Sequence, residues 1–248
     1  HEDEAALSCA LLLREALEVP GRTAALITPD AALARRVAVR LARFGIAADS
    51  SAGQSLAGFP TAVLAALVAE LSANPDDPVR LLAVLKHPLT RLGLEPEALA
   101  PLALRAAKAA LRGARRSRDA VLAQATRKDA EAAPVLQRLF AALGVAAAVF
   151  ANGAAPPSEA ARALVEALES LADAKLWTGP GGEATAGLLS ALIFEGQGLP
   201  PTTPRGFSEL LQRLLNGESA RPTGASHPRL QILGALEARL VRADVLVL

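Results

Sequence analysis

The sequence predicts an α/β fold that is helical over most of its length, in which a small parallel sheet is interrupted by a large all-helical insertion. Residues 24–46 and 229–248 are the only stretches with a strand–turn–helix pattern, and almost the whole chain lies between them. Hydrophobic residues make up 52% of the chain but aromatic residues only 3%, which favours close-packed helices with a core of Leu, Val and Ala. We therefore expect the two ends of the chain to lie side by side in one sheet.

The first segment, residues 1–54, is predicted to contain a helix, a buried strand and a second helix. Residues 2–18 begin with acidic side chains and end before a Pro-Gly pair, as expected of a helix. Residues 24–27 form a short apolar run closed by a Thr-Pro-Asp turn, which indicates a strand. Residues 31–44 carry arginines on one face and apolar side chains on the other, and residues 47–51 are predicted to be extended.

The insertion, residues 55–222, is predicted to consist of helices joined by turns that contain Pro, Gly or Asn. Asp76 and Asp77 are expected to cap one of these helices, and Trp177 is expected to be a packed anchor. The glycine cluster at residues 179–182 and the Pro-rich residues 199–205 are predicted loops. The predicted helices are residues 61–71, 79–86, 96–111, 120–143 (one or two helices), 158–176, 184–194 and 207–215.

The last segment, residues 223–248, is predicted to return to the sheet. It contains a strand at residues 230–234, a short helical turn at 235–242 and a further strand at 245–248. The chain has no methionine and stops at an apolar strand, which we interpret as an internal fragment of a longer parent protein. Methionines missing from the sequence are the alternative interpretation.

Composition excludes several classes of protein and of site. The single Cys9 cannot form a disulfide within the chain, and no uninterrupted apolar run of membrane-spanning length occurs. Because the first residues are acidic where a secretion signal would be basic, we expect a cytoplasmic protein with no membrane partner. His1 and His227 have no acidic or cysteine partner at ligand spacing, so we expect no metal site. The sequence also lacks the Gly-x-x-x-x-Gly-Lys-Ser/Thr loop that cradles nucleotide phosphates.

Three stretches resemble the superfamily 1 helicases of the UvrD type, in the order in which that family has them. Residues 24–30 with the arginine-bearing helix after them resemble motif IV, residues 74–82 resemble the start of the helical 2B insertion, and residues 230–248 resemble motif V. More specifically, residues 85–89, 111–113 and 230–248 resemble the AddB-type subunit of the bacterial AddAB helicase-nuclease.

The resemblance implies a RecA-like 2A-type domain of the P-loop NTPase class, formed by residues 1–54 and 223–248, with residues 55–222 as its 2B-type insertion. It also implies a degenerate nucleotide site. In motif IV, Thr28 stands where active relatives carry an Arg that reaches the phosphates. In motif V, the positions of a Thr, a Lys-Gly pair and a Glu are held by Gly234, Arg239 with Leu240, and Arg242, so only the basic residue is kept. The fragment then has no catalytic residue, and ATP and magnesium would belong to other parts of the parent.

The family further implies a function in DNA double-strand break repair and recombination. The chain would be a non-motor portion of a helicase-nuclease subunit that binds or guides DNA beside an AddA-like motor-nuclease partner. Two alternatives stay open: a fragment of an active UvrD-type ATP-dependent helicase, and a helical protein-interaction module without a nucleic-acid role.

Two groups of residues are candidates for DNA binding. One is a turn with Lys86, Arg91 and Gly93, where backbone amides and cations suit phosphate oxygens. Its alternative is a helix end closed by Pro88, with Lys86 and His87 complementing the helix dipole. The other group is a basic stretch, for which a solvated helix face is the alternative. Its members are Arg105, Lys108, Arg112, Arg115, Arg116, Arg118, Arg127 and Lys128.

Overall fold

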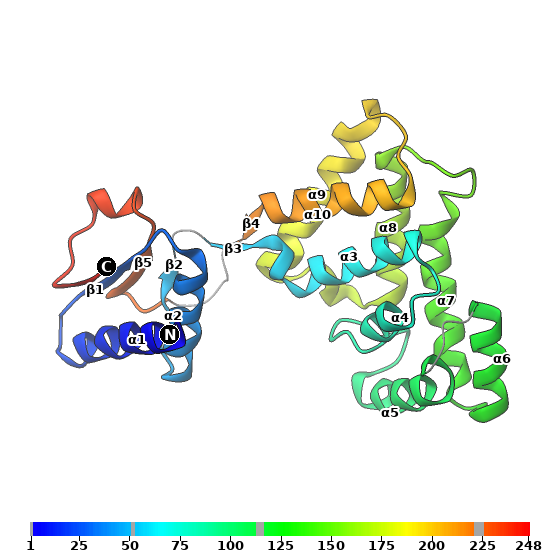
Figure 1. The fold of residues 1–248 in the computed structure, drawn as a ribbon, viewed down its shortest axis with the longest axis horizontal. Helices are drawn as coiled ribbons and strands as arrows, with labels where there is room; N and C mark the ends of the chain where they lie inside the picture. Colours follow the sequence, from blue (N-terminus) through cyan, green and yellow to red (C-terminus); the bar gives the residue numbers. More distant parts are fainter. Residues whose placement is uncertain (1, 51–52, 113–116, 221–225) are drawn as a thin grey trace. The chain divides into compact units, whose positions relative to one another are not determined.

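The chain forms two compact units, which we call the sheet unit and the helical unit (Figure 1). The computed structural model describes residues 2–50, 53–112, 117–220 and 226–248. The sheet unit comprises His1–Gln54 and Arg221–Leu248, and the helical unit comprises Ser55–Ala220. The assignment of these units to RecA-like 2A-type and 2B-type domains stays a prediction.

The sheet unit contains a parallel sheet that joins the two ends of the chain. Its strand order is β2-β5-β1-β6, and β1 pairs in parallel with both of its neighbours. Ala25 of β1 lies beside Gln231 of β5 on one side and Leu246 of β6 on the other. The prediction that the two ends share one sheet is therefore confirmed. The strands are β1 (Ala24–Ile27), β2 (Asp49–Ser50), β5 (Leu230–Leu233) and β6 (Val245–Val247).

Helices α1 (Glu2–Glu18) and α2 (Ala31–Arg43) pack on one face of this sheet and on each other. Leu13 of α1, Leu41 of α2 and Leu26 of β1 are fully buried in a single cluster. The opposite face carries the connection from β5 to β6, which contains the short turn η5 (Glu237–Leu240), as Figure 1 shows.

Polar side chains tie the distant segments of the sheet unit together. The Arg229 guanidinium donates hydrogen bonds to the carbonyl oxygens of Leu17, Val19 and Arg22, at 2.8 to 3.0 Å. The Asp244 carboxylate accepts hydrogen bonds from the backbone N–H and the hydroxyl of Thr23, both at 2.8 Å. These contacts hold the last segment of the chain against the end of α1 and the start of β1.

The helical unit is built around α3 (Pro60–Ala73), whose side chains are almost all apolar and which contacts five other helices of the unit (Figure 1). Leu64, Val68 and Leu71 of α3 are buried in the main core cluster. The strands β3 (Gln54–Ser55) and β4 (Ser219–Ala220) pair where the chain enters and leaves the unit. The other helices are α4 (Pro78–Leu85), α5 (Pro96–Ala106), α6 (Arg118–Lys128), α7 (Ala133–Ala148), α8 (Pro157–Leu171), α9 (Gly179–Glu195) and α10 (Pro204–Gly217).

Short turns adjoin several of these helices. They are the 3-10 turns η1 (Leu56–Gly58), η3 (Ala174–Trp177) and η4 (Gly196–Gly198), and the π-helical turn η2 (Ala107–Leu111). The predicted helix at residues 96–111 thus changes to π-helical geometry after Ala106, and the one predicted at 158–176 ends at Leu171. Asp77 caps α4 as expected, because its carboxylate accepts the backbone N–H groups of Val79 and Arg80.

The prediction of a loop at the glycine cluster is wrong. Residues 179–182 form the first turn of α9, in which Gly181 and Gly182 allow close packing, whereas Gly179 adopts a φ of 74° with open space around it. A Cβ on Gly182 would lie 2.5 Å from the Trp177 carbonyl carbon, and one on Gly181 would overlap the Phe59 ring. Trp177 itself is partly buried against the core and donates its indole N–H to Glu169. The Gly and Pro content of these four residues suggested a loop, but the close contacts with Trp177 and Phe59 explain why glycines occur there.

Among the described residues, no helix combines the length and the apolar character that crossing a membrane requires.

Candidate nucleic-acid interface and nucleotide site

Open α/β sheets bind ligands outside the carboxyl ends of neighbouring strands, and in the sheet unit these are the ends of β1 and β5. These strands are neighbours, and the connections that leave them cross opposite faces of the sheet, through α2 and through η5. Open α/β sheets bind ligands at such a reversal, and we refer to this position, outside the carboxyl ends of β1 and β5, as the crevice. Thr28 follows β1 and Gly234 follows β5, and the Thr28 N–H donates to the Leu233 carbonyl at 3.0 Å. The structure thus brings these two predicted residues together.

The polar groups at this crevice bind each other. Asp30 caps α2 by accepting the backbone N–H groups of Ala32 and Leu33, and its own N–H donates to the Thr28 hydroxyl. The helix N-terminus, which could otherwise attract an anion, therefore already holds a carboxylate. The Glu237 carboxylate lies so close to Gly234 that a Cβ there would overlap it. Two carboxylates thus stand where phosphates would need positive partners.

Arg239 and Arg242 lie on the connection between β5 and β6. Arg239 is part of η5 and Arg242 follows it, and both side chains are exposed. Neither forms an ion pair with another residue of the described ranges.

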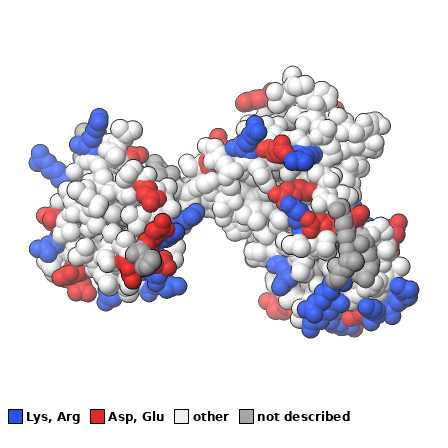
Figure 2. Space-filling model, in the orientation of Figure 1, with Lys and Arg blue, Asp and Glu red and all other residues white. Residues whose placement is uncertain are grey.

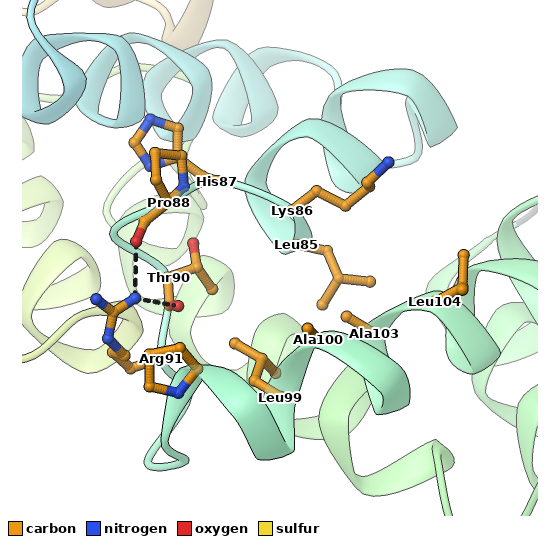
Figure 3. A pocket seen from close by; sticks show the side chains of 11 residues that line it. Leu85, Lys86, His87, Pro88, Thr90, Arg91, Leu99, Ala100, Ala103 and Leu104 are labelled. Atoms are coloured by element: carbon orange, nitrogen blue, oxygen red, sulfur yellow. Dashed lines mark hydrogen bonds between the residues drawn. The ribbon is translucent and has the colours of Figure 1, made fainter.

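The turn after α4 uses its predicted DNA-binding arginine internally (Figure 3). Arg91 donates from Nη1 to the carbonyl oxygens of Pro88 and Thr90, at 2.7 and 3.0 Å, and its Nε lies 3.3 Å from Asp173 Oδ2. Gly93 adopts a φ of 72° and is exposed. Arg91 therefore braces the turn and has little capacity left for a phosphate.

Lys86 and His87 close α4 in different charge states. Lys86 is exposed at the carboxyl end of the helix. His87 is half-buried, its Nδ1 accepts the Leu89 N–H, and burial lowers the pKa of its imidazole. His87 is therefore uncharged at neutral pH, so of the two side chains only Lys86 complements the helix dipole with a full charge.

An exposed basic surface covers the end of the helical unit at which α5 and α6 lie, as Figure 2 shows. We call it the α5–α6 face. Its exposed members form no ion pair with any other residue that the structure describes. They are Lys108, Arg112, Arg127 and Lys128. Arg115 and Arg116, also predicted to bind DNA, lie outside the described residues.

Two other arginines of the basic stretch are engaged within the fold. Arg105 forms a bidentate ion pair with Asp129, at 2.7 and 2.8 Å, and a further one with Glu131 at 2.9 Å. The hydrogen bonds of this group raise the pKa of Arg105 and lower that of Asp129. Arg118 is half-buried over the Phe140 ring, 5.5 Å from its centroid, and burial lowers the pKa of Arg118. Arg105 is exposed but already paired with carboxylates, and Arg118 is half-buried, so neither is counted among the members of the α5–α6 face.

A side chain that the sequence analysis did not single out holds α6 against the π-helical turn. Gln124 donates from Nε2 to the Ala109 carbonyl at 2.7 Å. This bond joins α6 to a backbone carbonyl of the π-helical turn η2. The hydrogen bond therefore fixes α6 against η2, the two elements that carry most of the α5–α6 face. Nothing in the local sequence marks Gln124, because its partner is 15 residues away.

The comparisons with known proteins add no family assignment. No protein-family model matches this sequence, and a search of curated proteins finds no match.

Proposed function

We propose that this chain is a non-hydrolysing, helicase-like, DNA-binding part of a double-strand-break repair subunit of the AddB type. The observation that carries the proposal is the α5–α6 face. Its exposed cations form no ion pair with described residues, while the neighbouring Arg105 is neutralised by Asp129 and Glu131. Cations that the fold leaves unpaired are available to neutralise phosphates.

The chemistry of the face favours the DNA backbone over the bases. Its four members are Lys and Arg, and the nearby Phe140 is buried beneath Arg118. Stacking of single-stranded bases needs exposed aromatic rings, which these residues do not supply. Contacts to phosphates position a duplex without reading its sequence. We therefore propose that the face guides DNA.

The crevice of the sheet unit supports the non-hydrolysing part of the proposal. Asp30 and Glu237 place negative charge at the carboxyl ends of β1 and β5, where nucleotide phosphates would be repelled. ATP and magnesium would then be bound by other parts of the parent, and an AddA-like motor-nuclease subunit would supply the hydrolysis. These partners follow from the resemblance of residues 85–89, 111–113 and 230–248 to the AddB-type subunit.

The test is the salt dependence of duplex binding. Fluorescence anisotropy would measure the affinity of a labelled duplex of about 20 base pairs, over a range of salt concentrations, for the chain and for a variant with all four face residues changed to Ala. Each neutralised phosphate contributes about 0.9 to the slope of log affinity against log salt, so the slope should fall by about 2 to 4.

A matched variant removes the same number of exposed positive charges elsewhere, through Ala at Arg35, Arg162, Lys175 and Arg213. It should keep the slope of the unmodified chain. Equal slopes for both variants would contradict the proposal, since binding would then follow net charge alone. Absence of duplex affinity would favour the interaction-module alternative, and ATP-stimulated unwinding by the parent without a partner would favour the active helicase.

A further inference from the structure

A pocket of about 240 Å³ opens in the helical unit between the end of α4 and the first two turns of α5 (Figure 3). Leu85 from α4 and Leu99 and Ala103 from α5 are buried and form its floor. Leu104, which is 47% exposed, lies at the lip of the pocket. The side chains that line the pocket are therefore mainly aliphatic.

The polar groups of the surrounding turn are already bound. The Thr90 hydroxyl donates to the Val84 carbonyl at 2.6 Å, and the Arg91 guanidinium donates to two carbonyls of the turn. An occupant would therefore gain mainly from burying apolar surface. The volume is below the 300 to 1,000 Å³ of pockets that hold drug-sized ligands or cofactors, so it suits a single bulky side chain.

The charges around the rim differ between the two ends of the pocket. Lys86 is exposed, forms no ion pair with a described residue, and lies with Leu104 on the same side of the pocket in Figure 3. Arg91 is balanced by Asp173, and His87 is neutral at pH 7. The exposed Glu95 and Glu97 flank the start of α5, at the other end of the pocket. A peptide segment that binds in the pocket would thus place a carboxylate near Lys86. It would have no carboxylate near the start of α5, where Glu95 and Glu97 would repel it.

We propose that this pocket binds one Leu- or Phe-sized side chain of an acidic segment of a partner protein, whose carboxylate pairs with Lys86. Interaction hot spots are commonly anchors that fill a pocket, and the rim around them is polar and exposed to solvent. The proposal concerns a protein partner and does not depend on DNA binding at the α5–α6 face.

The experiment uses the whole chain and a defined pool of fluorescent eight-residue peptides. Each peptide carries one Leu or Phe with two Asp or Glu residues on one side and Ser and Gly elsewhere. The same peptides with Ser in place of the apolar residue, and with Lys in place of the acids, are the controls. Anisotropy titrations should find saturable binding of acidic apolar peptides only, with dissociation constants below about 1 mM.

Three variants locate the binding. Ala100 lines the pocket but is exposed, so Ala100→Trp should fill the opening without disturbing the core and should weaken peptide binding at least about tenfold. Ala98→Trp adds the same side chain at an exposed position of α5 outside the pocket and should change nothing. Lys86→Glu should weaken binding of acidic peptides about two- to fivefold, as expected for an exposed ion pair.

Several results would overturn the proposal: no saturable binding by any peptide, equal binding of the Ser-substituted peptides, or equal losses from the two Trp variants. Stronger binding of the Lys-containing peptides would also contradict it. The Trp variants should leave duplex affinity unchanged. A loss of duplex affinity in Ala100→Trp alone, without a loss of peptide binding, would show that the pocket belongs to a DNA surface instead.

Discussion

The side chains that hold the sheet unit together and those of the α5–α6 face on the helical unit use their charges in opposite ways. In the sheet unit, Arg229, Asp244 and Asp30 bind backbone groups of the unit itself. On the α5–α6 face of the helical unit, Lys108 and Arg127 extend into solvent with no described acidic partner. The helical unit can leave cations exposed because its stability comes from an apolar core of close-packed helices. A region whose charges already hold its fold is a poor place to look for a ligand.

The largest expected effect tests whether close packing holds the helical unit. Gly182→Ala should lower the free energy of unfolding by about 2 to 4 kcal/mol, because the new Cβ would meet the rigid Trp177 backbone. Gly187 lies in the same helix with open space around it, so Gly187→Ala should stabilise by about 0.5 to 1 kcal/mol. Urea unfolding followed through the single Trp177 would measure both. Equal effects would show that the cluster is not closely packed.

The next effect tests the polar ties of the sheet unit. Arg229→Ala removes a charged donor from three carbonyl oxygens and should cost that unit about 2 kcal/mol. Arg229→Lys should recover only part of this, since one ammonium cannot reproduce the planar fork. Far-ultraviolet circular dichroism should show an earlier transition, while the Trp177 fluorescence of the helical unit stays unchanged. A simultaneous shift of both signals would mean that the two units do not unfold separately.

Sequence reasoning located most of the elements because local patterns determine them. The acidic start of α1, the Thr-Pro-Asp turn after β1 and the cap at Asp77 each act within a few residues. Pairing of the two chain ends was predictable because the few short apolar strands lie only near the ends and need partners in a sheet. The positions of side chains that depend on tertiary contacts were not predictable from the sequence. Arg91 turns inward because Asp173 lies beside it, and Arg118 lies over the Phe140 ring.

A smaller effect concerns pH. Asp244 has a pKa below its usual value, because the Thr23 backbone N–H and then its hydroxyl donate to the charged form. Its contribution to stability is therefore complete above the unfolded pKa near 3.8 and is lost as the pH falls through the lower folded value. Asp244→Asn should make the sheet unit less stable at neutral pH and less sensitive to acid below about pH 4. Asp119→Asn, an exposed change on α6, should leave the acid profile of the sheet unit as it is.

The smallest expected effect bears on the crevice. Asp30→Asn keeps the helix cap and Glu237→Gln keeps the side-chain shape, so the double variant removes negative charge with little change in structure. If repulsion by these two carboxylates were all that prevents phosphate binding, the double variant would bind ATP tightly. We expect at most a few-fold gain in pyrophosphate affinity and none in hydrolysis, because the chain still lacks the glycine-rich loop and its lysine. Isothermal titration calorimetry with pyrophosphate and with ATP would measure it. Micromolar ATP binding by the unmodified chain would remove the contrast between the units, since the sheet unit would then keep a functional nucleotide site despite its two carboxylates.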